Sequence, residues 1–219
     1  MDLNSLKKRI NEGPTPLSLL PIRTLENIEI LLSDVIENNI DGDFVETGVW
    51  KGGACILAYH VIKNLNSDKR VWAFDSFEGL PKPNPDKYPV DAGDGHWTID
   101  SLRVSVDSVK ENFRISSEIE IDNPIFVKGW FKDTMPVNNV QSISVLRLDG
   151  DMYESTIDVL NYLYPKLSIG GYCIIDDFGH KGAKAAVLDY RNQYLIDDEI
   201  RKIDDTPGVY PSVYWKKTK

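Results

Sequence analysis

The sequence predicts an α/β protein built around a mostly parallel sheet of seven strands. Short apolar or β-branched runs alternate along the chain with longer segments in which apolar residues recur at helical spacing. A turn that contains glycines, residues 48–53, follows the first expected strand and leads into an expected helix. Such a strand, turn, helix and strand unit opens a doubly wound sheet, so this segment decides the predicted fold class.

The expected elements follow in order. The N-terminal segment, residues 1–20, carries Pro14 and Pro16 among polar residues, and we expect it to form an arm or cap outside the core. Beyond it the pattern predicts five buried strands and five helices. The strands are expected at 43–47, 71–75, 125–129, 143–148 and 171–175, and the helices at 25–40, 54–65, 101–114, 154–167 and 182–194.

A long irregular segment and a terminal hairpin complete the chain. Residues 79–100 contain four prolines and no sustained periodicity, which is typical of a functional lid loop. Two short strands near 200–203 and 212–215 flank a Pro-Gly turn at 207–208. We expect them to end the sheet as an antiparallel hairpin.

Composition limits the partners and the compartment. The 219 residues suit one domain, which we expect at 41–219 after an N-terminal arm and helix at 1–40. The net charge of −9 opposes binding to nucleic acid, and no apolar run approaches the roughly 20 residues that cross a bilayer. Because no signal segment is recognisable, a cytoplasmic location is expected. Cys55 and Cys173 fall in apolar runs, so we expect buried thiols and no disulfide.

Four carboxylates follow two of the apolar strands. Asp149 and Asp151 come after one, and the Asp176-Asp177 pair comes after the next. Acids at the ends of buried strands lose solvation, which a cation, a hydrogen-bond donor or a proton must offset. Oxygen ligands suit Mg²⁺, Mn²⁺ or Ca²⁺, and the sequence holds no Cys/His cluster of the kind that indicates zinc. We therefore predict a site for a hard divalent cation.

The glycine turn and the second strand together predict a nucleoside-binding pocket. Gly48 and its neighbours allow a ligand to approach the backbone closely, although glycines alone would equally suit a plain tight turn. Asp75 ends the second strand, where an acid in dinucleotide folds accepts hydrogen bonds from ribose hydroxyls. Glu46, just before the turn, would repel a pyrophosphate and attract a cationic amino-acid group. This combination favours S-adenosylmethionine over NAD.

Four motifs in the right order give the chain a resemblance to a known family. They lie at residues 46–53, 74–81, 129–136 and 148–153, the last followed by Asp176 and Asp177. On these motifs the sequence resembles the macrocin-type sugar O-methyltransferases, which depend on S-adenosylmethionine and Mg²⁺. The resemblance covers most of residues 40–195. It implies a Rossmann-like class I methyltransferase fold that acts on a hydroxyl of a sugar or glycosylated natural product.

The resemblance also implies roles for individual residues. The acids matching Asp149, Asp176 and Asp177 hold the metal, Mg²⁺ or Mn²⁺, and the acid matching Asp151 is the candidate general base. The expected cofactor-binding residues come from the first three motifs and one of the acids: Glu46, Thr47, Gly48, Val49, Asp75, Ser76, Gly129, Trp130 and Asp149. Spacing leaves open which of Asp149 and Asp151 is ligand and which is base, and whether Asp151 only caps the following helix.

Several alternatives remain open at the level of sequence. His96 in the expected lid is a candidate alternative base and His180 a candidate site residue, while either one would also suit a solvated loop. The competing classes are a haloacid dehalogenase-type phosphatase, a catechol-type methyltransferase and a non-enzymatic binding module on a cofactor fold. The expected partners are a small-molecule glycoside or polyol and, in a homo-oligomer, further copies of the chain. Nucleic acids and membranes are not among them.

Overall fold

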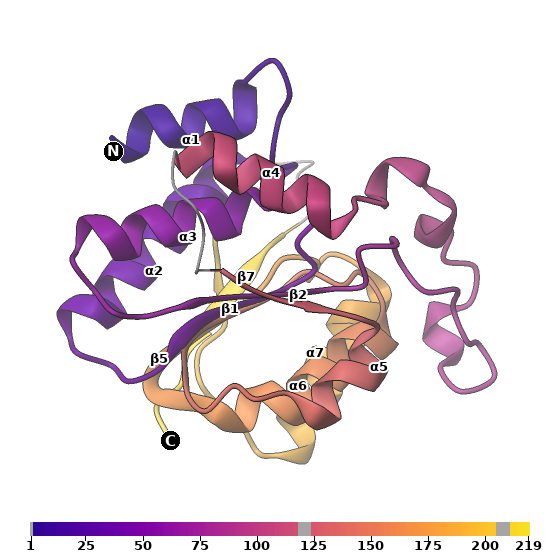
Figure 1. The fold of residues 1–219 in the computed structure, drawn as a ribbon. Helices are drawn as coiled ribbons and strands as arrows, with labels where there is room; N and C mark the ends of the chain where they lie inside the picture. The colour runs from indigo at the N-terminus through magenta and orange to yellow at the C-terminus, as the bar shows by residue number, and fades with distance from the viewer. Residues whose placement is uncertain (1, 118–123, 205–210) are drawn as a thin grey trace.

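One mixed sheet with helices on both faces forms the body of the protein in the computed structural model, which describes residues 2–117, 124–204 and 211–219 (Figure 1). Seven strands pair in the order β3-β2-β1-β4-β5-β7-β6. Strands β1 to β5 pair in parallel, whereas β7 is antiparallel to both β5 and β6. The predicted fold class and the C-terminal hairpin are confirmed, and the predicted turn at 207–208 lies outside the described residues.

The strands are short and the helices vary from one turn to more than four. The strands are β1 (Asp43–Thr47), β2 (Val71–Asp75), β3 (Ile125–Lys128), β4 (Ile143–Leu148), β5 (Leu167–Ile175), β6 (Arg201–Lys202) and β7 (Val213–Lys216). The α-helices are α1 (Leu3–Glu12), α2 (Ile22–Glu37), α3 (Gly53–Asn64), α4 (Val106–Ser117), α5 (Phe131–Thr134), α6 (Tyr153–Leu163) and α7 (Lys181–Gln193). The 3-10 helices are η1 (Pro89–Asp91), η2 (His96–Thr98), η3 (Asp100–Leu102), η4 (Met135–Val137) and η5 (Tyr164–Lys166).

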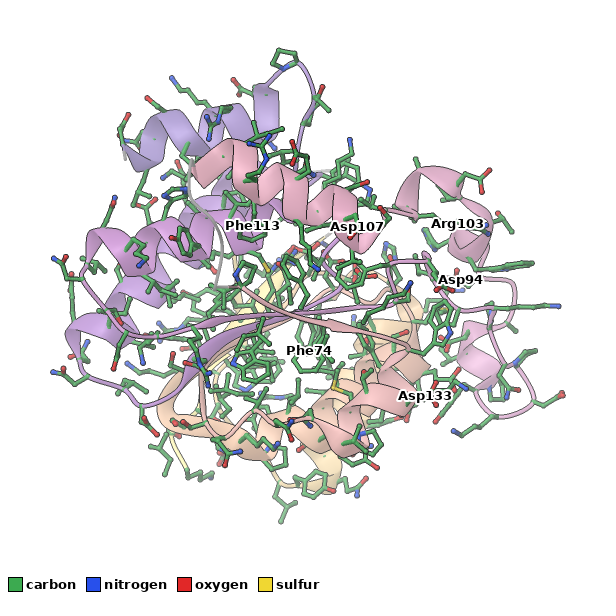
Figure 2. All side chains as sticks on the ribbon, in the orientation of Figure 1. Phe74, Asp94, Arg103, Asp107, Phe113 and Asp133 are labelled. Carbon is green, nitrogen blue, oxygen red and sulfur yellow. The ribbon has the colours of Figure 1, made fainter. Side chains whose placement is uncertain are left out.

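Two apolar layers sandwich the sheet. Helices α1 to α4 cover one face, and α5 to α7 cover the other (Figure 1). Phe113 of α4 belongs to the first layer and Phe74 of β2 to the second, and Figure 2 shows them on opposite sides of the sheet. Because β1 and β4 are covered on both faces, nearly all of their side chains are buried. The centre of the sheet is therefore a rigid platform.

Parallel pairing brings the carboxyl ends of the central strands to one edge of this platform. Leu148 of β4 lies in register with Thr47 of β1 on one side and with Ile175 of β5 on the other. The ladder continues one residue further, because the amides of Asp149 and Asp176 donate to the carbonyls of Thr47 and Leu148, both at 2.9 Å. Strand order reverses between β1 and β4, which is where open α/β sheets bind ligands.

The prediction that residues 1–20 stay outside the core is wrong for α1. Leu6 and Ile10 are buried in the first apolar layer, where α1 packs against α2 and α3. Leu3, Leu6 and Ile10 recur at helical spacing, and the Asp2 side chain caps the helix by accepting hydrogen bonds from two backbone N–H groups. The prolines come only after the helix has ended, so they do not oppose it.

Two helix boundaries differ from the prediction by four or five residues, each for a local reason. Helix α4 begins only at Val106, because the Ser105 hydroxyl accepts a hydrogen bond from the amide of Ser108 and so caps the helix there. Helix α6 ends at Leu163, before Pro165, whose ring opposes continuation of an α-helix. Strand β5 starts correspondingly earlier than predicted and is the longest strand of the sheet.

The segment 79–102, here called the lid, lies beside the sheet and is tied to α6 by one buried carboxylate. All of its residues are described, and they form η1, η2 and η3 but no α-helix or strand. Asp91 is buried and accepts hydrogen bonds from the amides of Tyr153 (2.8 Å) and Glu154 (3.2 Å). The N-cap residue of α6, Met152, makes no side-chain cap, so Asp91 caps this helix from the lid. Among the described residues, no helix has the length and apolar character needed to span a membrane.

Candidate active site

Four carboxylates gather at the carboxyl ends of β4 and β5. We call Asp149, Asp151, Asp176 and Asp177 the acid floor. One carboxylate oxygen from each of Asp149, Asp151 and Asp177 lies within 4.8 Å of the others. Asp176 turns toward Arg147, with its Oδ1 3.1 Å from the guanidinium Nη2. The tightest trio of the floor therefore contains Asp151 in the place that the resemblance gave to Asp176.

Arg147 of β4 is the counter-charge of this region. Its side chain is 1% exposed, and its Nη2 lies 2.9 Å from Asp149 Oδ2 as well as beside Asp176. Its Nη1 donates to Glu46 Oε1, so one guanidinium connects three carboxylates from the ends of β1, β4 and β5. Charge-assisted pairs of this kind fix the positions of the acids as well as offsetting their burial.

The single positive charge of Arg147 does not balance the negative charges of the four carboxylates of the acid floor. Burial raises the pKa of Asp149 well above its ordinary value, and repulsion from Asp176 and Asp177 raises it further. The pKa of Asp177 is raised in the same way, first by burial and then by the charges of Asp151 and Asp176. The site therefore has a deficit of positive charge, which a divalent cation or protons would relieve.

Asp151 adopts a strained backbone conformation at the centre of the floor. Its φ of 58° lies in the left-handed region that favours glycine. Its amide donates to Asp177 Oδ2 at 2.9 Å, and its Oδ1 lies 3.2 Å from His180 Nδ1. The residue that begins α6 is Tyr153 and the N-cap is Met152, so the capping role considered for Asp151 is not seen. Strain held at a defined position of this kind is a common feature of active sites.

Glu46 lies at the end of β1, beneath the glycine turn. It is 1% exposed and accepts a hydrogen bond from the Cys55 thiol at 2.7 Å in addition to the Arg147 bond. Burial raises the pKa of the Cys55 thiol, which therefore stays protonated and donates. Cys55 and Cys173 are both free and buried, as predicted, although Cys55 acts as a donor and not merely as a small apolar side chain.

Gly48 is required by the close approach of β1 and β4. Its φ is 86°, and a Cβ at this position would fall 1.7 Å from the carbonyl oxygen of Asp149. Any other residue would push the two strand ends apart. The glycine turn thus serves the acid floor directly, because it allows Asp149 to lie against the end of β1.

Asp75 at the end of β2 organises the turns around the expected nucleoside pocket. Its carboxylate accepts the amide hydrogens of Val49 and Phe77, both at 2.7 Å. Burial raises the pKa of Asp75, while these amide hydrogen bonds oppose the shift. The neighbouring Ser76 hydroxyl donates to the carbonyl of Gly79 at 2.6 Å and holds the start of the lid. The acid predicted to face a ribose is thus also a structural clamp for two loops.

Two adjoining cavities open over these strand ends. The smaller, of about 110 Å³, has six of the predicted cofactor residues in its wall: Gly48, Asp75, Ser76, Gly129, Trp130 and Asp149. The larger, of about 490 Å³, has the whole acid floor in its wall together with Glu46, Gly48, Val49, His96 and Arg147. Thr47 lines neither cavity, since its hydroxyl donates to the carbonyl of Arg147 at 3.4 Å beneath the turn.

Three side chains of this region were missed or left undecided by sequence reasoning. Arg147 sits within the apolar β4 run, where an isolated arginine is itself a signal that a buried carboxylate lies nearby. His180 lies beside Asp151, and hydrogen bonding to that carboxylate raises its pKa. Asp91 carried no local signal at all, because its partners lie 62 and 63 residues further along the chain.

The residues present fit both groups that the sequence predicted. An all-carboxylate donor set with a deficit of positive charge suits a hard divalent cation such as Mg²⁺ or Mn²⁺. The smaller cavity joins a glycine turn, an acid at the end of β2 and the indole of Trp130, which suits a nucleoside. The sheet order, the antiparallel β7 and this pocket beside β1 define the protein as a class I S-adenosylmethionine-dependent methyltransferase.

Comparison with known proteins agrees with this class. The family described as Macrocin-O-methyltransferase (TylF) matches residues 10–217. Demethyldecarbamoylnovobiocin O-methyltransferase of Streptomyces niveus is 43% identical over 92% of this chain and 76% of its own length. A tetracenomycin-C 4'-O-methyltransferase of Streptomyces olivaceus, named for its dimethoxy-rhamnosyl substrate, is 39% identical over 92% of this chain and 76% of its own.

A solved structure gives the same result. The O-methyltransferase NovP superposes with a TM-score of 0.88 at 41% identity, covering 97% of this chain and 88% of that one. The chain belongs to the macrocin O-methyltransferase family and is an O-methyltransferase. Membership sets aside the phosphatase and the non-enzymatic binding module as alternatives.

Proposed function

We propose that the enzyme methylates a hydroxyl of a sugar that is carried on a larger, partly apolar molecule, with Mg²⁺ or Mn²⁺ held at the acid floor. The observation that carries this proposal is the composition of the larger cavity. Its floor is four carboxylates, and its wall includes the exposed apolar side chains of Leu19 (69% exposed) and Ile99 (41% exposed). A polar, hydroxyl-rich group suits the floor, and an apolar aglycone suits the rim.

The relatives support a sugar acceptor. The name of the Streptomyces olivaceus enzyme places its methyl group on a rhamnosyl unit, and this enzyme is 39% identical to the chain. A flat catechol is the remaining alternative, because catechol-type enzymes use the same donor and a similar metal. The cavity volume of about 490 Å³ favours the bulkier acceptor.

Sugar hydroxyls are weak acids, so the chemistry depends on making one of them nucleophilic. When bound, S-adenosylmethionine supplies an electrophilic methyl group and the divalent cation lowers the pKa of a chelated hydroxyl. Asp149 and Asp177 are the ligands common to the set implied by the resemblance and to the tightest trio of the floor. Asp151 would accept the hydroxyl proton at its carboxylate. The contact with His180 orients this carboxylate, and the Asp177 carboxylate holds the backbone of Asp151 by accepting from its amide.

The chain's other residues position these groups. The guanidinium of Arg147 pairs with the Asp149 carboxylate, so that this carboxylate keeps one orientation during turnover. The indole of Trp50, in the glycine turn, donates to the carbonyl of Ser101 at 2.8 Å. This hydrogen bond joins the glycine turn to the lid. The lid and the residues around Leu19 would exclude water from the reacting atoms once an acceptor is in place.

The test is methyl transfer from isotopically labelled S-adenosylmethionine to two acceptor panels, followed by mass spectrometry. One panel holds deoxysugar glycosides with apolar aglycones and the other holds simple catechols. We expect label in the glycosides, lost with EDTA and restored by Mg²⁺. Label in the catechols alone would show that the acceptor is an aromatic diol and not a sugar. Methyl transfer that continues in the presence of EDTA would show that the reaction does not need the metal.

A further inference from the structure

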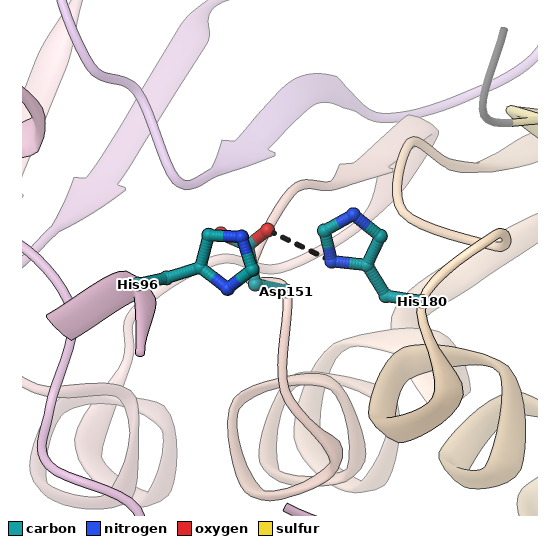
Figure 3. A group of neighbouring side chains, drawn as sticks. All are labelled: His96, Asp151 and His180. Atoms are coloured by element: carbon teal, nitrogen blue, oxygen red, sulfur yellow. Dashed lines mark ion pairs between the residues drawn. The ribbon is translucent and has the colours of Figure 1, made fainter. Parts of the chain in front are cut away.

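Two histidines far apart in the sequence meet over Asp151. His96 comes from η2 in the lid, and His180 is the N-cap residue of α7. One ligating atom from each of His96, Asp151 and His180 lies within 4.8 Å of the other two. Figure 3 shows the three side chains together, each from a separate segment of the chain, with the ion pair between His180 and Asp151 dashed. The sequence alone showed no such cluster, because 84 residues separate the histidines.

We propose that His96, Asp151 and His180 form a second metal site, selective for a borderline cation such as Zn²⁺ or Co²⁺. Two imidazole nitrogens and one carboxylate oxygen are ligands that these cations accept and that Mg²⁺ accepts poorly. The all-oxygen trio of the acid floor has the opposite preference. The two trios share Asp151 but differ in chemistry, and Asp149 and Asp177 remain as the ligands proposed for Mg²⁺.

The distance between two of the ligands already matches a metal-bound geometry. His180 Nδ1 lies 3.2 Å from Asp151 Oδ1. Ligands at the usual zinc bond length stand about 3.3 Å apart at the edge of a tetrahedron. His96 completes the triangle from the lid, which has to approach by at most about 1.5 Å for all three edges to reach that length.

The orientation of His96 is fixed as it is for many metal-binding histidines. Its ring Nδ1 lies 3.0 and 3.1 Å from the two carboxylate oxygens of Asp94. The backbone amide of His96 also donates to Asp94, at 2.9 Å, so ring and backbone are held together. A carboxylate on one ring nitrogen leaves the other, Nε2, as the coordinating atom and raises its basicity.

The cluster is open to an ion from solvent. The side chains are 37% exposed for His96, 22% for His180 and 18% for Asp151. A bound ion would join η2 of the lid to the end of β4 and the start of α7. It would also engage Asp151, and for that reason, which rests on the proposed role of Asp151 as proton acceptor, we expect Zn²⁺ to inhibit methyl transfer.

The test uses the full chain and Co²⁺ as the probe, in excess Mg²⁺ so that the acid floor is occupied. Visible absorption separates a four-coordinate site with nitrogen ligands, which gives strong bands, from all-oxygen six-coordinate binding, which gives weak ones. We expect one equivalent of Co²⁺ with strong bands, displaced by Zn²⁺. His96→Gln and His180→Gln should each weaken binding at least tenfold, and Asp94→Asn, which removes no ligand, should weaken it by 10 to 100-fold.

The control is His60→Gln, which changes the third histidine of the chain, buried on α3. Thermal melting of each variant shows whether it is folded. The proposal is overturned if His96→Gln and His180→Gln bind Co²⁺ like the wild type, if His60→Gln loses as much, or if only weak bands appear. None of these outcomes depends on methyl transfer, so the metal site fails or stands independently of the proposed activity.

Discussion

The acid floor and the lid surround the same cavity but are built in opposite ways. The floor lies at the ends of buried strands. Arg147 holds Asp149 and Asp176, and the backbone amide of Asp151 holds Asp177. The lid consists of three 3-10 turns without a regular backbone ladder, and Ile99 at its inner side is 41% exposed. From this difference we infer that the strand ends position the reacting groups and that the lid selects the acceptor, because the lid can change in sequence without disturbing the sheet.

The two regions also differ in how they are anchored. Several mutually dependent charge pairs hold the floor, so that removing one partner leaves the others uncompensated. The lid is tied by separate contacts, chiefly the Asp91 cap on α6 and the bond from the Trp50 indole to Ser101. Substitutions should therefore have large, coupled effects in the floor and smaller, separable effects in the lid.

The largest effect is expected for Arg147→Met. This change removes the guanidinium and leaves the buried Glu46 and the half-buried Asp149 and Asp176 without their cation. Breaking a buried pair in this way costs about 3–5 kcal/mol of unfolding free energy. Urea unfolding monitored by circular dichroism measures that loss. Arg103→Met, at an exposed arginine that directly follows the lid, is the matched control and should change stability little. Equal stability of the wild type and Arg147→Met would contradict the inference that the floor is more strongly anchored than the lid.

A smaller effect is expected for Asp91→Ala in the lid. The change removes both hydrogen bonds to the start of α6, and loss of an N-terminal cap costs about 1 kcal/mol. Because the lid loses an anchor, we expect the KM of the acceptor to rise while the affinity for S-adenosylmethionine is nearly kept. Asp100→Ala, at a side chain that is 91% exposed, is the control. A loss of stability as great as that of Arg147→Met would show that the lid is part of the rigid platform.

Much of the acid floor could be predicted from the sequence. Apolar runs followed by Asp149 and Asp176 indicated parallel strands whose ends meet, because register in a parallel sheet brings consecutive carboxyl ends to one edge. The glycine turn at 48–53 was also predicted, although the sequence did not show that Gly48 is needed for Asp149 to lie against the end of β1. The floor was predictable because it follows from local pattern and sheet geometry alone.

The rest could not be predicted, because it depends on contacts between distant segments. Asp91 reaches α6 across 62 residues, and His96 meets His180 through the path of the lid. The helical spacing around Leu6 was obscured by the prolines that follow it, so α1 was wrongly placed outside the core. Irregular segments lack the periodicity that makes strands and helices readable.

A specificity effect of about tenfold or less is expected for Leu19→Ser at the rim of the larger cavity. The side chain is 69% exposed, so the folded state loses little on substitution, whereas an apolar aglycone loses a contact. The kcat/KM for an apolar glycoside should fall, and that for the free sugar should be unchanged. Val137→Ser, at a 74% exposed side chain on η4, is the control. An equal fall in kcat/KM for both acceptors would show that Leu19 does not contact the aglycone.

The smallest effect concerns Asp158 on α6, a partly buried acid without the strong pairing of the floor. Burial, and then the nearby charge of Glu154, raise its pKa to about 6. The folded state thus binds this proton more tightly than the unfolded state, a contribution that is lost as the pH rises through about 6. Asp158→Asn should therefore raise the Tm above that pH, with the gain shrinking as the pH falls. A gain in Tm that does not change with pH would show that the gain comes from packing and not from removal of the Asp158 charge.

The central claim is that the acid floor holds a divalent cation separately from the methyl donor, and calorimetric titration of Mg²⁺ tests it most directly. The wild type and Asp177→Asn are each saturated with S-adenosylhomocysteine, and Mg²⁺ is then added. We predict that both bind the nucleoside, that the wild type binds one Mg²⁺, and that Asp177→Asn has lost that site. Mg²⁺ binding of equal strength in both proteins would contradict the claim, as would a wild type that does not bind the nucleoside.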